Sequence, residues 1–520
     1  MNDLRIRRVV IVGGGTAGWM AAAVFSRVMG DSLDIHVVES DAIGTVGVGE
    51  STIPQIRNVN HFLGIDEDAM LRATSGTFKL AIQYNDWVRP GHSYLHAFGD
   101  VGLPLGPLPF QHYWLRRRAE AGVEDLATYS LNATAAKACR MARIDKVGTG
   151  PMAGIKYAFQ FDAGLYGRML RTYAEQRRVR RTEGKVVDVR LHGESGFIEG
   201  ITLESGERID GDLFIDCSGF RGLLIEGALK SGFEDWRKWL ACDRALAVAS
   251  LSASPMRPYT QANARPAGWQ WRIPLQHRTG NGHVYCSEFM ADDEAAAILL
   301  GSLDGKPLGD PRPIRFTSGV RRQIWSRNCV AVGLAAGFLE PLESTAIHLI
   351  QSGISRLLSL FPDRGFDQSI IDEYNRNTRR EYEQVRDFLV LHYRTVERRD
   401  TPFWRRCADL PPPDSLRHKL EIFNATGQIF REGEELFTEH SWLQVMAGQG
   451  ILPRRHHPLA DSLPREKLEE FLGSIRTLIG GAVGQMRSHE RFIAEHCAKV
   501  PRICDGDHST HKAPSSGVYR

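Results

Sequence analysis

The segment VVIVGGGTAGWMAAAVFSRV, Val9–Val28, decides the fold of the amino-terminal part of the chain. Its first four residues are a short continuous apolar run, as expected of a buried parallel strand. The run leads directly into GGGTAG at residues 13–18, which matches the pattern GxGxxG. An apolar stretch of helical character follows, and then a second apolar run, Ile35–Val38, which ends at Glu39. This order predicts a complete strand–helix–strand unit.

Such a unit predicts a dinucleotide-binding site. The glycines allow a tight turn and a close approach of backbone to pyrophosphate, and the start of the helix faces the phosphates. Glu39, about 20 residues beyond the last glycine, is placed to accept hydrogen bonds from ribose hydroxyls. An acid at this position disfavours the 2′-phosphate of NADP. The residues expected to contact the cofactor here are Gly13, Gly15, Thr16, Ala17, Gly18 and Glu39.

Two later segments favour FAD over NAD. GDLFIDCSGFRG, Gly211–Gly222, is typical of a strand that ends in a glycine turn. NCVAVGLAAGFLEP, Asn328–Pro341, is a second apolar strand with Gly333 at its end. Each segment alone could be an ordinary buried strand and turn. Together with the first motif they predict the returning strands that complete an FAD cleft in two-domain flavoproteins.

The composition is that of an ordinary globular protein. The chain has 520 residues, of which 42% are hydrophobic and 24% charged, enough for more than one domain. Its net charge of +3 does not indicate a nucleic-acid partner, and the basic cluster at 177–181 favours a solvated face. Eight cysteines without a CxxC pair predict neither a metal site nor a disulfide framework. With no apolar run of ~18 residues and no visible signal peptide, we expect a cytoplasmic protein without a membrane segment.

Motifs in a fixed order give the chain its resemblance to a known family. They are VGVGESTIP (Val46–Pro54), FKLAIQYNDW (Phe78–Trp87), GWQWRIPL (Gly268–Leu275), GFLEPLESTAIHLIQ (Gly337–Gln351) and RDFLVLHY (Arg386–Tyr393). With the GxGxxG segment, the chain resembles the flavin-dependent tryptophan halogenases from about residue 7 to about residue 405. The resemblance implies an α/β fold: a Rossmann-like FAD-binding domain with a mixed sheet, and a mostly helical carboxy-terminal region over the substrate.

The resemblance also implies a reaction. Reduced FAD and oxygen oxidise chloride or bromide to hypohalous acid, which passes through a tunnel to a lysine, here Lys79. An electron-rich ring, usually an indole, then takes up the halogen near a glutamate, here Glu343. An ammonium can polarise hypohalous acid or a neutral amine can bind the halogen, and a carboxylate stabilises a cationic ring and helps remove its proton. From local pattern alone, Lys79 would be a surface lysine and Glu343 a helix-start acid.

Further residues are assigned through the same resemblance. The halide is expected at the backbone amides of Thr345 and Ala346, where a helix start suits an anion. The family often has glycine at the second position, so the methyl of Ala346 leaves the size of the halide open. His96 and Phe98 are expected to sandwich the substrate ring. The remaining cofactor positions are Val46, Ser51, Val186, Gly333, Leu334 and Ile347, and the box expected to wall the flavin off from substrate is Trp269, Trp271, Ile273 and Pro274.

The substrate itself stays open. Tryptophan-specific members hold the amino acid with a tyrosine pair, and none lies between Phe423 and Pro453. That stretch offers Phe437 and Trp442 instead, so a free, substituted or larger indole is as suitable as tryptophan. Because one nucleotide fingerprint is visible, we expect a separate NAD(P)H-dependent flavin reductase as partner, and a homodimer is possible. The alternatives are a single-component flavin monooxygenase, a phenol or pyrrole halogenase, which typically lacks the glutamate, and a non-catalytic flavin-binding protein.

The expected domain organisation has three parts. Residues 1–360 form an FAD-binding and halogenation module with inserted substrate-contacting segments, 361–505 a helical substrate-covering region, and 506–520 a loose tail. The helical prediction rests on apolar residues at helical spacing in Ser369–Tyr393 and Arg465–Cys497.

Overall fold

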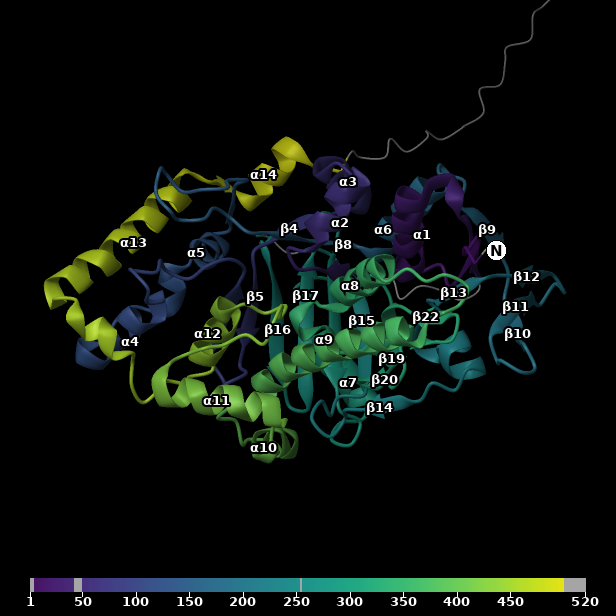
Figure 1. Cartoon of the computed structure of the whole chain (residues 1–520). Coiled ribbons are helices and arrows are strands. Elements are labelled where there is room, and N and C mark those ends of the chain that lie inside the picture. The colour runs from purple at the N-terminus through teal and green to yellow at the C-terminus, as the bar shows by residue number, and fades with distance from the viewer. Residues whose placement is uncertain (1–3, 42–48, 253–254, 500–520) are drawn as a thin grey trace, which may run out of the picture.

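The amino-terminal motif lies in a six-stranded mixed sheet. The computed structural model describes residues 4–41, 49–252 and 255–499 (Figure 1). The sheet has the order β21-β22-β13-β1-β2-β9, and all its neighbours are parallel except β21 and β22. Its strands are β1 (Arg8–Val12), β2 (Asp34–Glu39), β9 (Arg180–Glu183), β13 (Leu213–Asp216), β21 (Trp325–Ser326) and β22 (Cys329–Ala331). The predicted α/β class and the two returning strands, β13 and β22, are thereby confirmed.

The first helix follows β1 as predicted. α1 (Thr16–Met29) begins after the glycine turn and packs against α6 (Ala163–Glu175) and α8 (Ala346–Ser359). At the outer strand β9 the basic cluster is paired with acids, Arg180 with Asp34 at 2.6 Å and Arg178 with Asp31 at 3.1 Å. The cluster is therefore a solvated, ion-paired face, as expected.

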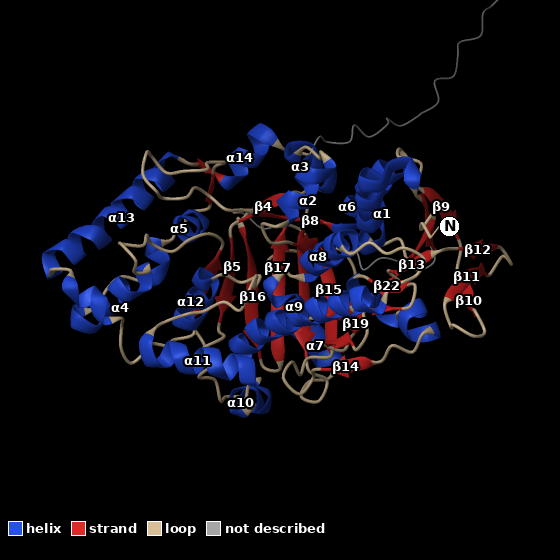
Figure 2. Cartoon of the chain, in the orientation of Figure 1, coloured by secondary structure: helices blue, strands red, loops and turns tan. Residues whose placement is uncertain are grey.

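A seven-stranded sheet forms the middle of the molecule (Figure 2). Its order is β19-β15-β18-β17-β16-β5-β6, and its neighbours are antiparallel except β16 and β5. Its strands are β5 (Ala81–Asn85), β6 (Ser93–Ala97), β15 (Arg244–Ser250), β16 (Tyr259–Arg265), β17 (Gly268–Pro274), β18 (Thr279–Tyr285) and β19 (Arg312–Arg315). The tryptophan box is the central strand β17, and the segment around Lys79 leads into β5.

Small sheets and short helices complete the part of the chain before residue 360. The sheets are β3 (Gly49–Ser51), β8 (Ala158–Asp162) and β4 (Thr77–Lys79); β10 (Val186–Leu191), β11 (Ile198–Leu203) and β12 (Arg208–Asp210); and β14 (Phe233–Asp235), β20 (Gly319–Arg321) and β23 (Gly337–Phe338). The helices are α2 (Ile56–Leu63), α3 (Glu67–Thr74), α4 (Phe110–Ala121), α5 (Leu131–Lys137) and α7 (Asp292–Gly301).

The chain after α8 is mostly helical, as predicted, and α11 to α13 lie on the side opposite the N-terminus (Figure 1). The helices are α9 (Gln368–Arg394), α10 (Pro402–Asp409), α11 (Asp414–Thr426), α12 (Glu439–Gly448), α13 (Arg465–Gln485) and α14 (His489–His496). No helix in the described ranges is both long and apolar enough to cross a membrane. The division at residue 360, between α8 and α9, stays a prediction, and the tail at 506–520 lies outside the described residues.

One helical prediction is wrong in detail. The stretch 465–497 is not continuous, because α13 ends at Gln485 and the next residues are extended. There β24 (Arg487–Ser488) pairs with β7 (Arg140–Met141), and the Ser488 side chain accepts a hydrogen bond from the Arg491 amide to start α14. The serine cap and the strand pairing together override the helical periodicity.

Candidate active site

The turn between β1 and α1 leaves room for a phosphate group. A side chain at Gly15 would meet no atom within 4 Å, and the start of α1 carries no side-chain cap. Gly13 has φ of 115°, and a Cβ there would lie 2.2 Å from the carbonyl oxygen of Cys217, so this turn packs directly on the turn after β13. The first amides of α1 therefore have no side-chain cap and lie next to the open space at Gly15. This arrangement fits a pyrophosphate.

The surrounding residues fit the rest of a dinucleotide. Glu39 ends β2, and its carboxylate accepts from the Trp19 indole at 3.2 Å and from the Arg181 guanidinium. The hydroxyl of Ser51 is buried without a hydrogen-bond partner among the described residues, which costs free energy unless another group completes it. Gly333 approaches Ala17 so closely that a Cβ would lie 2.9 Å from that methyl. The residues present therefore fit FAD.

The other expected cofactor residues are spread more widely. Ile347 is buried in the first turn of α8, whereas Leu334 is 37% exposed in the turn after β22. Val186 opens β10 in a separate three-stranded sheet, just after β9. Val46 lies outside the described residues. The cofactor role of each of these residues stays a prediction.

Lys79 is fully buried at the end of β4. Its Nζ donates to the Thr52 carbonyl at 3.1 Å and to the Ser344 hydroxyl at 2.8 Å. Burial lowers the pKa of the amine from 10.5 to about 7, although the carboxylates of Glu343 and Glu50 act in the opposite direction. The interpretation of Lys79 as a surface residue is wrong. The chain passes at Leu80 from the β3-β8-β4 sheet to the seven-stranded sheet, so neither face of this segment meets solvent.

Glu50 was not expected in the site. It lies on β3, and burial raises the pKa of its carboxyl to about 7, while the Lys79 charge acts to lower it. Glu50 lies inside the quoted motif VGVGESTIP, and this position is the signal from which it could have been predicted as a site residue.

Glu343 is held by side chains from three other elements. It ends a short turn, Pro341–Glu343, and is 1% exposed. Its carboxylate accepts from the Tyr84 hydroxyl, from His96 Nδ1 at 2.9 Å and from His392 Nε2 at 2.9 Å. Burial would raise the pKa of this carboxyl, but the charge of His96 and the hydrogen bonds of both histidines outweigh burial and hold it far below its ordinary value.

The expected halide amides stand at the start of a helix. Ser344 adopts a left-handed conformation with φ of 60°, which turns the chain from Glu343 into α8. Thr345 is the N-cap of α8 without a side-chain cap, and Ala346 is its first residue. The first amides of a helix have no partner within it, so this position can hold an anion.

Aromatic rings gather beside the lysine and the glutamate. The Phe98 ring centre is 5.3 Å from Lys79 Nζ, so one expected substrate residue faces the amine. His96, the other, contacts Glu343 through Nδ1 and packs against Phe388 with ring centres 5.5 Å apart. Phe388 in turn stacks on Phe437 at 3.7 Å. The sandwich role of His96 and Phe98 stays a prediction.

Three residues of the tryptophan box, Trp269, Trp271 and Ile273, lie on one face of β17. Trp269 and Trp271 are 1% and 8% exposed, and their ring centres are 6.2 Å apart. The Trp269 indole donates to Glu340 at 3.0 Å, while Trp271 covers Gly282 on the neighbouring strand. Ile273 lies against Gly49 of β3, a strand of the same sheet that carries Lys79. Pro274 ends the strand, and its carbonyl accepts from the Thr77 hydroxyl at 2.7 Å.

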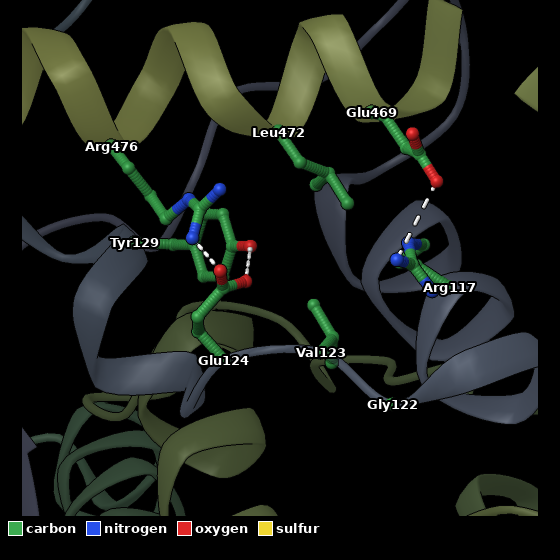
Figure 3. A pocket seen from close by; sticks show the side chains of 8 residues that line it. All are labelled: Arg117, Gly122, Val123, Glu124, Tyr129, Glu469, Leu472 and Arg476. Carbon is green, nitrogen blue, oxygen red and sulfur yellow. Dashed lines mark hydrogen bonds and ion pairs between the residues drawn. The ribbon is translucent and has the colours of Figure 1, made fainter. Parts of the chain in front are cut away.

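Two cavities lie apart from these residues. One, of about 490 Å³, lies between α4 and α13, where Arg476 pairs with Glu124 and Arg117 with Glu469 (Figure 3). The other, of about 940 Å³, is lined by residues from 54–68 and 143–157. Neither lining includes Lys79 or Glu343.

The sequence comparisons identify the family to which the chain belongs. The family model for tryptophan halogenase matches residues 8–465. Tryptophan 6-halogenase ThaL of Streptomyces albogriseolus is 35% identical over 90% of this chain and 94% of its own length. Tryptophan 7-halogenase RebH of Lentzea aerocolonigenes is 32% identical over 94% and 99%.

Solved structures give the same answer. Xcc4156, a flavin-dependent halogenase from Xanthomonas campestris, is 48% identical with a TM-score of 0.92, over 95% of this chain and 99% of that one. BrvH, a flavin-dependent halogenase from Brevundimonas sp. BAL3, is 45% identical with a TM-score of 0.91 over the same shares. The single-component monooxygenase is therefore not favoured. The chain belongs to the tryptophan halogenase family and is a flavin-dependent halogenase.

Proposed function

We propose that this enzyme halogenates an indole or a related electron-rich ring, with hypohalous acid held at Lys79 as the immediate halogen donor. The observation that carries the proposal is the burial of an amine and a carboxylate next to Ser344. The Lys79 amine donates to the Ser344 hydroxyl, and Glu343 is the residue before Ser344 in the chain. Bound reduced FAD supplies, with oxygen, the two-electron oxidation of chloride or bromide to hypohalous acid. The residues that would hold it are those of the glycine turn, Glu39 and Ser51.

Lys79 suits a reagent that must be both held and activated. Its pKa of about 7 gives comparable amounts of ammonium and amine at neutral pH. The ammonium can donate a hydrogen bond to the oxygen of hypohalous acid, and the amine can take the halogen itself. In either form, burial keeps the oxidant away from solvent and from other reactive side chains.

Glu343 suits the ring that reacts. As the carbon–halogen bond forms, the oxygen–halogen bond breaks and the oxygen leaves as water after taking a proton. The ring then carries a positive charge until its C–H proton departs. An anionic carboxylate stabilises this charge and accepts that proton.

The halide and the substrate are proposed from the same region. We assign the halide to the amides of Thr345 and Ala346, with chloride and bromide both admitted. ThaL and RebH are named as tryptophan halogenases, and we carry the indole ring over to this chain. The full amino acid is not carried over, because Phe437 and Trp442 stand where a tyrosine pair would be expected.

Two protein partners are proposed for the enzyme. Reduced FAD would come from a separate NAD(P)H-dependent reductase, and the enzyme would act as a homodimer in the cytoplasm. Light scattering of the purified enzyme tests the dimer.

The reaction is tested with indole, bromide, oxygen and FAD kept reduced by a separate reductase. We expect bromoindole by mass spectrometry. Lys79→Ala should abolish it while FAD binding, followed by flavin fluorescence, is retained. Hydroxyindole without any halogenated product would overturn the proposal, and so would full activity of Lys79→Ala.

A further inference from the structure

The Glu343 carboxylate uses its two oxygens unequally. Oε1 accepts from the Tyr84 hydroxyl, from His392 Nε2 at 2.9 Å and from His96 Nδ1 at 3.0 Å. Within the part of the chain that the structure describes, Oε2 accepts from His96 Nδ1 alone, at 2.9 Å. One oxygen is therefore saturated with protein donors, and the other keeps acceptor capacity for a reacting group.

The tautomer of His392 follows from its neighbours. The Gln449 amide nitrogen lies 3.1 Å from the His392 carbonyl oxygen, which can only accept, so this side of the amide is the NH₂ group. The same NH₂ group donates to the Tyr94 hydroxyl oxygen at 3.0 Å. This leaves the hydroxyl proton of Tyr94 free for His392 Nδ1, 2.8 Å away. The neutral imidazole must then carry its proton on Nε2, where it donates to Glu343.

Stacking holds the rings of Tyr84, Tyr94 and His392 in place. Tyr84 stacks on Tyr94 with centres 4.8 Å apart and on His392 with centres 4.5 Å apart. His392 is fully buried on α9, and burial lowers the pKa of its imidazole, which favours the neutral form. An imidazole that cannot turn and cannot change tautomer is suited to orienting a carboxylate.

We propose that His392 is a positioning residue of the halogenation site: its Nε2–H, selected by Tyr94, keeps Glu343 anionic and leaves Oε2 for the ring proton. This rests on the proposed role of Glu343. The titratable groups that face Glu343 are Tyr84 from β5, Tyr94 and His96 from β6, His392 from α9 and Lys79 from β4. Of these, His392 is the histidine outside the expected ring sandwich, so its replacement tests the carboxylate more directly than that of His96.

Removing His392 should raise the pKa of Glu343. The hydrogen bond from His392 is one of the contributions that lower the Glu343 pKa, and burial is the contribution that raises it. In His392→Leu the carboxyl therefore holds a proton at a higher pH than in the unaltered enzyme. A protonated carboxyl neither stabilises a cationic ring nor accepts its proton, so halogenation fails first on the acidic side.

The experiment compares His392→Leu, His392→Gln and Tyr94→Phe at pH 6 and pH 8. We expect kcat for halogenation to fall about 100-fold at pH 6 in His392→Leu, within the range of one positioned acid–base group, and less at pH 8. His392→Gln keeps an N–H donor and should recover most of the loss. Tyr94→Phe keeps the stacked ring but loses the hydroxyl, and should share the acidic loss to a smaller degree. His283→Leu removes an equally buried imidazole on β18 and should leave the pH profile unchanged.

A second readout does not depend on turnover. Infrared difference spectra at pH 6 should show a protonated carboxyl band in His392→Leu that disappears when Glu343→Gln is added to that variant. An unaltered pH profile together with no such band would overturn the proposal. If the unaltered enzyme gives no halogenated product, the proposed function fails, and the infrared comparison still decides whether His392 holds Glu343 anionic.

Discussion

At the scale of single residues, the burial of Lys79 lowers the stability of the fold, and this cost accompanies the catalytic role proposed for its amine. Its pKa is about 7 in the folded enzyme and near 10.5 when unfolded, so between these values the unfolded chain binds more protons. The stability of the enzyme therefore rises with pH across this window, and the full cost of the buried charge is present below pH 7.

Lys79→Met removes this cost and keeps the length of the side chain. We expect its melting temperature to exceed that of the unaltered enzyme by a few degrees at pH 6.5, and the difference to shrink at pH 9.5, as measured by calorimetry. Halogenation should be lost at both pH values. A variant less stable than the parent at both pH values would mean that the contacts of Lys79 with Thr52 and Ser344 outweigh its burial.

Ala346 is the residue at which halide size can be tested. Its methyl group adjoins the amide assigned to the halide, so Ala346→Gly enlarges the site at a cost of ~1 kcal/mol or less in the first helical turn. In equal chloride and bromide, we expect the ratio of brominated to chlorinated product to rise several-fold. Ala163→Gly makes the same change at the first residue of α6 and should leave the ratio unchanged. If the ratio of brominated to chlorinated product is the same in both variants, the assignment of the halide to these amides is wrong.

The catalytic residues of the proposed site could be predicted only through the resemblance to a known family. Lys79 and Glu343 were identified by resemblance, whereas local periodicity placed Lys79 at the surface. His392 and Tyr84 lie inside quoted motifs, but nothing in either segment shows that both contact Glu343. Contacts of this kind join residues far apart in the chain, and the sequence carries no signal for them until the sheets are assembled.

At the scale of elements, the flavin-side wall predicted at β17 is tested through its neighbour β18. A Cβ at Gly282 would lie 2.0 Å from the Trp271 ring, so Gly282→Ala displaces the ring without deleting it. We expect the share of reduced FAD that yields halogenated product to fall several-fold, with hydrogen peroxide rising in its place. The strain should also cost about 1–3 kcal/mol of stability.

The matched control for this variant is overpacking in the other sheet. In Gly211→Ala the new Cβ would lie 2.8 Å from Val10 Cγ2, so stability is lost at a distance from the tryptophan box. If both variants lose stability and both keep their yield of product per reduced FAD, Trp269 and Trp271 are core residues and do not wall the flavin off from substrate.

Elements with strong periodicity were predicted well, and local exceptions were not. The pattern in Ser369–Tyr393 gives α9 within one residue at each end. The stretch 465–497 has a similar pattern but is divided, because a serine cap and a two-residue strand pairing act at one point. Periodicity is a sum over many residues, whereas a break is decided by one or two contacts.

At the scale of the whole molecule, the strand order was beyond prediction. The β1–α1–β2 unit and the two returning strands follow from apolar runs and glycine turns. The seven-stranded sheet does not, because its strands come from Ala81–Ala97 and from Arg244–Arg315, and the two segments are joined by the parallel pair of β5 and β16. Pairing of distant strands is set by tertiary packing, to which local propensity contributes little.

A last property of the whole molecule is the source of the electrons that reduce its FAD. The sequence carries one nucleotide fingerprint, which we assign to FAD, and the proposed function has reduced flavin delivered by a separate reductase. We expect NADH alone to leave the absorbance of enzyme-bound oxidised FAD unchanged and to give no product. Photoreduced FAD, or a reductase behind a dialysis membrane that passes FAD, should restore halogenation. Bleaching of the bound flavin by NADH in the purified enzyme would contradict this, because it would require a hydride route within the chain itself.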